Sequence, residues 1–365
     1  MSNILKVATG IKTGADANPA LVSTAIQSAL EKAGVQTAGS VLLFLTSEFA
    51  TTPQLAIKAA AIAASTTQVI GCSATGIFTE DEWVLDGAAA AAMIFSEDIF
   101  SSLSEAVQPS EYLLTLAAPS ALNANWLNSK QKRFGGISGD ATGRGPFSVW
   151  HNGKGTTQGY CEFGIHHCQV AVAASHGLKL ISSPRKVTSS QHLDLIHVAH
   201  IPALTSIQSA CQRQNVAIDD LPYHLLMIAY AKTAHALEQG EYALASIVMT
   251  DDEANTITLS HPIAQGSWIC WALRDTTTAK AEMLNTAQQL QQQLHQNPAF
   301  ALMFSCIGRG PYFYNGNDQD LAAVKTIFPK LPIIGFYGNG EIAPILGTNT
   351  LLQYSAVLGL FAAQV

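Results

Sequence analysis

The order of apolar and polar residues predicts a helix, a strand, a second helix and a second strand in the first part of the chain. A helix is expected over residues 19–33, because this amphipathic stretch opens with a proline and is followed by a glycine. Residues 40–46 form a short, continuously apolar run, which is typical of a strand buried on both faces. A helix over 52–64 and a buried strand over 68–70 follow, and this order indicates one parallel unit.

The last part of the chain shows the same order. Residues 301–306 and 331–334 are expected to be buried strands around a helix over 318–328. A glycine-rich turn over 335–340 follows, as the turn over 71–76 does in the first part. We therefore predict two structurally related strand–helix–strand units about a pseudo-two-fold axis. The expected fold class is α/β (mixed α+β), with mixed sheets flanked by helices.

The middle of the chain is expected to contain both hairpins and helices. The turn signal Asn152-Gly153 indicates a hairpin between residues 147–151 and the apolar run 160–174. A helix is expected over 223–238. The other expected elements are helices at 202–214 and 278–295 and strands at 193–199, within 262–274 and on both sides of 251–255.

Composition narrows the class of protein. The 365 residues include 19 Lys and Arg and 26 Asp and Glu, a formal net charge of −7, and 12% are charged while 48% are hydrophobic. The longest apolar run, residues 87–95, is far shorter than the about 20 residues of a membrane-spanning helix. With few basic residues and an isoelectric point near 5.8, the chain lacks a surface for tracking phosphates. Neither a nucleic acid nor a membrane is therefore an expected partner.

Cysteine usage and length bear on the compartment and on the domains. Six cysteines occur without a C-x-x-C spacing and no signal peptide is evident, so buried free thiols in a reducing cytoplasm are expected. A chain of this length suggests two domains, which we place at residues 1–220 and 221–365. The many small apolar residues also suit a homo-oligomeric interface.

Polar and charged residues gather where the predicted strands end. Ligands of open α/β sheets usually bind outside the carboxyl ends of the strands, where loops and backbone groups converge. The guanidinium of Arg309 suits a ligand carboxylate, and Glu341 suits a ligand ammonium group. Asp140 lies in another glycine-rich stretch, where it either bonds its own turn or faces a ligand. The candidate ligand-binding residues are Cys72, Ser73, Thr75, Asp140, Cys306, Arg309, Tyr337, Asn339 and Glu341.

Other chemistries leave weaker signals. The eleven histidines show neither H-E-x-x-H nor the spacing of a zinc ribbon, so no metal site is predicted. A haem needs only one axial histidine in an apolar pocket and leaves no spacing signature, so it stays open. Cys72 or Cys306 at a strand end is a candidate nucleophile, with His176 or another residue as its base. No G-x-S-x-G pattern is present, and the sequence does not assign the base. A buried, unreactive cysteine is the alternative.

Four glycine-containing stretches carry a family resemblance. Residues 68–76 (QVIGCSATG) and 135–140 (GGISGD) lie in the first half, and SCIGRG at 305–310 precedes PIIGFYGNGEIAP at 332–344. Together with residues 248–275, these stretches resemble the FIST family. The first two are similar to its N-terminal domain and the others to its C-terminal domain, so that the resemblance covers nearly the whole chain.

The resemblance implies a non-enzymatic sensory module that binds small molecules such as amino acids in signal transduction. Some bacterial members are haem proteins that sense nitric oxide and regulate a histidine kinase, and in eukaryotes the domain accompanies an F-box. This chain reads Gly76-Ile-Phe78 where haem-type relatives carry a Gly-Glu pair. We expect a cytoplasmic small-ligand sensor without a cofactor, whose output passes through a separate partner such as a histidine kinase. A haem-based nitric-oxide sensor and a Cys-dependent enzyme are the alternatives.

Overall fold

The computed structural model describes residues 5–102, 111–127, 129–140, 142–216, 223–240 and 242–363. The chain divides into two units, of which the first comprises residues 1–176 and 280–365 and the second comprises residues 177–279. The predicted domain boundary between residues 220 and 221 lies outside the described residues. Each unit is described by itself below.

A mixed six-stranded sheet of the first unit is built around one strand–helix–strand motif. Strands β2 (Ser40–Thr46) and β3 (Val69–Ala74) run parallel, and α2 (Gln54–Ala64) connects them, as predicted. The strand order is β1-β6-β2-β3-β10-β11, and every other neighbouring pair is antiparallel. The remaining strands are β1 (Val7–Gly14), β6 (Ala88–Phe95), β10 (Val149–His151) and β11 (Lys154–Gly155).

A second six-stranded sheet repeats this pattern of directions. Strands β22 (Phe300–Cys306) and β23 (Ile333–Gly338) run parallel around α7 (Gln319–Ile327), in the order β13-β26-β22-β23-β4-β5. The outer pairs are again antiparallel. The prediction of two related units in a mixed α+β fold is therefore confirmed. The outer strands are β13 (Cys168–Ser175), β26 (Ala356–Ala363), β4 (Gly76–Thr79) and β5 (Trp83–Val84).

A third six-stranded sheet, which the sequence patterns do not predict, joins distant parts of the chain. Its order is β25-β24-β9-β8-β12-β7, and its one parallel pair is β8 with β9. Two of its strands follow β23 in the sequence, whereas the others come from the first half of the chain. The strands are β7 (Phe100–Ser102), β8 (Tyr112–Ala117), β9 (Lys132–Ile137), β12 (Tyr160–Ile165), β24 (Glu341–Ile345) and β25 (Thr348–Leu352).

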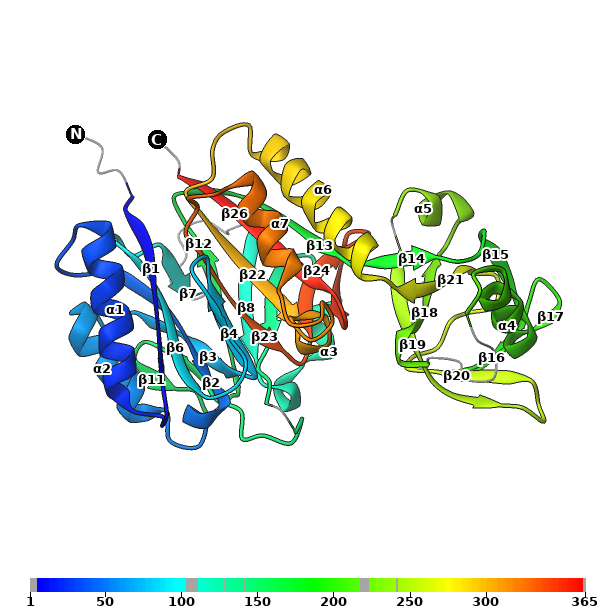
Figure 1. The fold of residues 1–365 in the computed structure, drawn as a ribbon, viewed down its shortest axis with the longest axis horizontal. Coiled ribbons are helices and arrows are strands. Elements are labelled where there is room, and N and C mark those ends of the chain that lie inside the picture. Colours follow the sequence, from blue (N-terminus) through cyan, green and yellow to red (C-terminus); the bar gives the residue numbers. More distant parts are fainter. Residues whose placement is uncertain are drawn as a thin grey trace. The chain divides into compact units, whose positions relative to one another are not determined.

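Helices cover the outer faces of the first two sheets (Figure 1). Helix α1 (Pro19–Ala33) packs with α2 on the β2 sheet, and α6 (Thr276–Leu294) packs with α7 on the β22 sheet. Helix α1 begins after Asn18, whose side chain accepts a hydrogen bond from a backbone N–H of the first turn, and it ends at Gly34 in the left-handed region. Short helical turns also occur at Ser47–Phe49 (η1), Pro119–Ala121 (η2), Ala124–Leu127 (α3) and Ile307–Arg309 (η4).

The main core lies where the three sheets meet. Phe44 of β2, Phe134 of β9 and Phe304 of β22 belong to one buried cluster, so each sheet contributes an aromatic ring. The centroids of Phe44 and Phe336 are 5.0 Å apart in an edge-to-face arrangement, which favours such pairs beyond their buried area. Buried side chains from the interiors of these strands thus hold the three sheets together.

The second unit is a small antiparallel sheet with its own core. Its strands follow the order β14-β21-β15-β16-β20-β19-β18, and a further pairing of β18 with β21 closes the sheet on itself. Helix α4 (Ala203–Arg213) buries its apolar residues in the same cluster. The other elements are β14 (Leu178–Leu180), β15 (Arg185–Gln191), β16 (Asp194–Val198), β17 (Ile201–Pro202), η3 (Tyr223–Leu225), β18 (Leu226–Ala231), α5 (Ala234–Glu238), β19 (Ala243–Asp251), β20 (Thr256–Leu259) and β21 (Trp268–Arg274).

The helix predicted over 223–238 is wrong for most of its length. Residues 226–231 form strand β18, and only residues 234–238 are helical. Strand β18 pairs with β19 on one side and β21 on the other. Pairing on both edges fixes the extended conformation, and this tertiary context overrides a local helical pattern.

The predicted hairpin has a different partner strand. Asn152 and Gly153 form a two-residue turn with φ of 50° and 71°, and β10 pairs with β11 rather than with residues 160–174. A two-residue turn places its immediate neighbours opposite each other, which explains this pairing. The later run is divided at His167, which has a φ of 58°, into β12 and β13 of two different sheets.

The two predicted glycine-rich turns are largely strand. Residues 71–74 continue β3, and residues 335–338 continue β23. A Cβ on Gly71 would lie 1.7 Å from the backbone oxygen of Leu43, so the glycine serves close strand packing rather than a turn. The chain actually turns at Thr75 and at Asn339-Gly340.

Two predictions about composition can also be compared with the structure. The six cysteines are buried and free, as expected. Within the described part of the chain, no helix combines the length and the hydrophobicity needed to cross a bilayer.

Candidate functional site

Three of the candidate residues, Ser73, Thr75 and Asn339, meet where β3, β9 and β23 end, and Asp140 follows Gly139 in the chain. The backbone N–H of Thr75 donates to the Tyr337 oxygen (3.1 Å), and that of Asn339 donates to the Ile137 oxygen (3.0 Å). The hydroxyls of Ser73 and Ser138 lie 3.2 Å apart. These contacts hold together a set of polar residues from three sheets. We call it the strand-end junction, and it consists of Ser73, Thr75, Ser138, Gly139, Asp140 and Asn339.

The side chains of the junction converge over Gly139. A Cβ on this glycine would lie 2.7 Å from Oγ1 of Thr75 and 3.0 Å from Oδ1 of Asn339, so any larger residue would collide with both. Oγ1 of Thr75 and Oδ1 of Asp140 are buried, and neither has a hydrogen-bond partner among the described residues. Since most buried polar atoms in native proteins are paired, the junction contains two exceptions.

Asp140 has the first of the two roles that the sequence leaves open, because it bonds its own turn. Its Oδ2 accepts hydrogen bonds from Oγ1 of Thr142 (2.5 Å) and from the backbone N–H of Gly145 (3.2 Å), which orders its own turn. Desolvation acts to raise the pKa of this carboxyl, but these hydrogen bonds and that of the Gly143 N–H outweigh it and lower the pKa. Asp140 is therefore an ionised carboxylate with one oxygen in the turn and one oxygen unpartnered.

Arg309 is held by a buried carboxylate of the same unit. Its Nε donates to Oδ2 of Asp320 (2.8 Å) and its Nη2 to Oδ1 (3.0 Å), while Nη1 donates to the backbone oxygen of Ser175 (2.8 Å). Arg309 is 1% exposed and Asp320 is fully buried. Such a two-pronged pair fixes the turn after β22 to the start of α7. Arg309 is not part of the proposed site, because its guanidinium is already hydrogen-bonded to both carboxylate oxygens of Asp320.

Glu341 lies in the same buried region and is not paired. It is fully buried, and no described residue gives a hydrogen bond to either carboxylate oxygen. Burial raises the pKa of the Glu341 carboxyl well above its ordinary value; the positive charge of Arg309 and the backbone N–H of Ser355 only partly offset this rise. The Ser355 N–H thus lies close to the carboxyl without meeting hydrogen-bond geometry. Burial and the missing hydrogen-bond partners both favour the un-ionised form of this carboxyl.

His176, which the sequence suggests only as a possible base for a cysteine nucleophile, is a neighbour of this buried region. Its Nδ1 lies 3.0 Å from Oγ of Ser355, and its backbone N–H donates to Oε1 of Glu282 (3.0 Å). Burial, followed by the charge of Arg309, lowers the pKa of His176 to about 4, so that it is neutral at pH 7. No spacing pattern marks this residue, because Ser355 is 179 positions away in the sequence.

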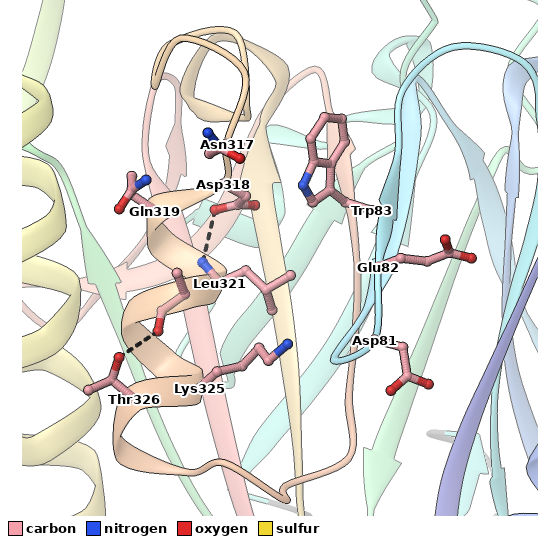
Figure 2. A pocket seen from close by; sticks show the side chains of 10 residues that line it. Asp81, Glu82, Trp83, Asn317, Asp318, Gln319, Leu321, Lys325 and Thr326 are labelled. Atoms are coloured by element: carbon pink, nitrogen blue, oxygen red, sulfur yellow. Dashed lines mark hydrogen bonds between the residues drawn. The ribbon is translucent and has the colours of Figure 1, made fainter.

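Tyr337 points away from the junction towards the start of α7. Its hydroxyl donates to Oδ2 of Asp318 (2.5 Å), while Oδ1 of Asp318 accepts the backbone N–H of Leu321 (2.8 Å) and caps the helix. Burial, and then the nearby Asp320, raise the pKa of Asp318 to about 6. Asp318 also lines a groove of about 640 Å³, in which the Trp83 indole forms one wall and residues of α7 the other (Figure 2).

The two candidate cysteines occupy different environments. Cys72 lies within β3 in the main core, where burial, followed by nearby Cys161, raises the pKa of its thiol well above the ordinary value. A thiol that stays protonated is a poor nucleophile, so the geometry does not support an enzyme that uses Cys72. Cys306 is buried at the end of β22, where its backbone N–H donates to the oxygen of Ser355 (3.0 Å).

Two grooves on the described part of the chain offer no axial ligand for a haem. Across the described residues there is no group of three or more His, Cys, Asp or Glu side chains that could hold a metal ion. The groove beside Trp83 and the smaller groove of about 460 Å³ beside Phe328 have no His, Cys or Met in their linings. The deeply buried His176 bonds Ser355 and faces a charged region rather than an apolar pocket.

Fold and site together define a mixed α+β protein with two related sheets and a candidate small-ligand site where their strands end. Comparison with protein families agrees with this class. The FIST N domain matches residues 40–197, and the FIST C domain matches residues 203–344. The chain belongs to the FIST family, whose domains are associated with the sensing of small ligands in signal transduction.

Individual relatives are distant. An uncharacterised protein of Mycobacterium bovis is 24% identical over 229 residues, which cover 62% of this chain and 59% of that protein. A second uncharacterised protein, from Mycobacterium tuberculosis, is 23% identical over 62% of this chain and 60% of its own length. Human F-box only protein 22 is 36% identical over 70 residues, 19% of this chain and 16% of that protein. The matches with the mycobacterial relatives thus span less than two thirds of their length.

Proposed function

We propose that this chain is a small-ligand sensor in signal transduction, with its binding site at the strand-end junction. The observation that carries the proposal is the pair of buried oxygens, Oγ1 of Thr75 and Oδ1 of Asp140, that have no hydrogen-bond partner among the described residues. An unmet buried hydrogen-bonding group costs about 1–3 kcal/mol. A ligand that satisfies both oxygens recovers this free energy and is favoured over water.

The junction selects the chemistry of its ligand. An ionised Asp140 accepts hydrogen bonds only, and the Thr75 hydroxyl and Asn339 amide add further acceptor and donor positions. We therefore expect a small polar ligand that presents N–H donors to the junction.

The signal is proposed to leave through a separate partner. The family association with signal transduction supports this step, and a histidine kinase or another cytoplasmic signalling protein is the expected partner. The proposed protein acts in the cytoplasm as a binding protein, without haem or catalysis, and homo-oligomer formation is a further expectation. The poor fit of the described residues to a haem and the un-ionised Cys72 thiol support this ranking over the haem and enzyme alternatives.

Thermal-shift screening with the free amino acids and related metabolites tests the function. A ligand of the junction raises the melting temperature, and Thr75→Val removes one hydrogen-bonding group while keeping the side-chain shape. We expect this variant to weaken a stabilising ligand about tenfold or more, which corresponds to about 1.4 kcal/mol. Thr24→Val, at an exposed position of α1, is the matched control and leaves the affinity unchanged.

Two results would reject the proposal. One is a complete screen in which no metabolite stabilises the protein. The other is a bound ligand whose affinity is the same for the wild type, Thr75→Val and Thr24→Val, because such a ligand binds away from the junction.

A further inference from the structure

The carboxyl group of Glu341 is the most isolated buried acid among the described residues. Glu341 is the first residue of β24, where it lies opposite Gly136 of β9 and Leu352 of β25. It is fully buried, and both of its oxygens lack a hydrogen-bond partner within the described part of the chain. A buried acid in this state is retained at a cost to stability, which calls for a functional reason.

The surroundings of Glu341 do not supply a counter-charge. Arg309 lies near enough to lower the pKa of the Glu341 carboxyl, but its guanidinium forms a two-pronged ion pair with Asp320. His176, bonded to Ser355, is neutral at pH 7. The other titratable groups around this cluster, Glu282, Tyr314 and Asp318, are acids. An ionised Glu341 therefore adds one uncompensated negative charge to the core.

We propose that Glu341 receives an ammonium group of the ligand and releases its own proton to the solvent as it does so. The inference rests on the proposed function, since Glu341 follows Asn339-Gly340 directly at the end of β23. The exchange conserves charge and atoms: a carboxylic acid and R–NH₃⁺ become a carboxylate paired with R–NH₃⁺, and one H⁺ leaves. The two unpartnered oxygens then accept hydrogen bonds from the ammonium group.

Proton release couples ligand binding to pH. While Glu341 is protonated in the ligand-free protein, each increase of one pH unit strengthens the binding of an ammonium group about tenfold. Conversely, acidification weakens binding without any change in the ligand. The sensor therefore responds to a low-molecular-weight amine and to pH through the same side chain.

Methylammonium chloride is the simplest probe of this exchange. It carries three N–H donors, whereas tetramethylammonium chloride has the same charge and none. Melting temperatures are compared for the two salts at equal ionic strength, at about pH 6 and about pH 8. The proteins are the wild type, Glu341→Gln and the matched control Glu31→Gln, which makes the same substitution at an exposed position of α1.

The expected result is a higher melting temperature in methylammonium than in tetramethylammonium for the wild type and Glu31→Gln, with the larger difference at pH 8. In Glu341→Gln the difference is lost. No difference in the wild type, the same difference at both pH values, or a difference that persists in Glu341→Gln would overturn the proposal.

An infrared measurement covers the case in which Glu341→Gln does not fold. The carbonyl stretch of an un-ionised carboxylic acid is expected in the wild type at neutral pH and decreases as methylammonium is added. A band that does not respond contradicts the exchange. Failure of the methylammonium test together with a metabolite that binds through Thr75 rejects only the role of Glu341. Failure of the metabolite screen alone rejects the proposed sensor.

Discussion

Two charged residues at the same strand ends have opposite environments. Arg309 and Glu341 both follow strands of the β22 sheet, and from the sequence both are candidates for charged groups of a ligand. In the structure Arg309 donates to Asp320 and Ser175, whereas Glu341 has no hydrogen-bond partner among the described residues. The difference depends on Asp320, which lies at the start of α7, eleven positions after Arg309. No sequence motif identifies Asp320 as the partner of Arg309.

At the residue scale, the buried carboxyl of Glu341 leads to a prediction of how the free energy of unfolding depends on pH. Its pKa is raised in the folded protein, so its contribution to stability is complete below pH 4.5 and is lost as pH rises towards the raised value. Relative to Glu341→Gln, the wild type is expected to lose about 1.4 kcal/mol of unfolding free energy per pH unit in this interval. Denaturant unfolding at a series of pH values measures the two slopes.

The same experiment contains its own control. Asp318 and His176 also have shifted pKa values, but they are present in both proteins and cancel in the comparison. Parallel stability curves for the wild type and Glu341→Gln would show that the Glu341 carboxyl ionises in the fold as it does in the unfolded chain.

At the scale of elements, the sequence predicts the two parallel strand–helix–strand motifs and little of the sheet that joins them. The motifs are local: apolar runs give β2, β3, β22 and β23, and α1 has a proline at its start and a glycine at its end. The third sheet pairs β24 with β9, whose strands lie about two hundred positions apart, and no local pattern encodes such a pairing. For the same reason the sequence identifies Thr75 and Asn339 as candidates without showing that they meet beside Gly139.

Each motif has one glycine at a similar place in its second strand, Gly71 in β3 and Gly335 in β23. Substituting these glycines tests whether the two motifs pack in the same way. Gly71 faces Leu43 of β2, and Gly335 faces Met303 of β22, where an added Cβ would lie 1.7 Å and 1.8 Å from the respective backbone oxygen. We expect Gly335→Ala to destabilise the protein by about 3 kcal/mol, as overpacking of a filled core does, and Gly71→Ala to have a similar effect. Chemical denaturation measures both losses.

Gly155→Ala provides the comparison for these variants. Gly155 lies in the short strand β11, and a Cβ there meets no atom within 4 Å. Its substitution is therefore expected to leave stability nearly unchanged. Equal effects at positions 155 and 335 would mean that the strands separate enough to accept a side chain, against the close packing described here.

At the scale of the whole molecule, the charged residues are few and the buried ones have specific structural roles. Only 12% of the residues are charged, and several of them lie inside the first unit rather than on its surface. Asp320 balances Arg309, Asp318 caps α7, and Asp140 orders the turn after β9. Among the described residues, the buried side-chain atoms without hydrogen-bond partners are Oγ1 of Thr75, Oδ1 of Asp140, Nε1 of Trp150 and both carboxylate oxygens of Glu341. We propose that a ligand supplies the missing partners at the strand-end junction and at Glu341.

The most direct test of this account is the electron density at the strand-end junction in crystals of the wild-type protein soaked with the mixture of free amino acids used for screening. The account predicts density for a bound small molecule within about 3 Å of Oγ1 of Thr75 and Oδ1 of Asp140. Density for protein and water alone at the junction, or a ligand bound only elsewhere on the molecule, would contradict it.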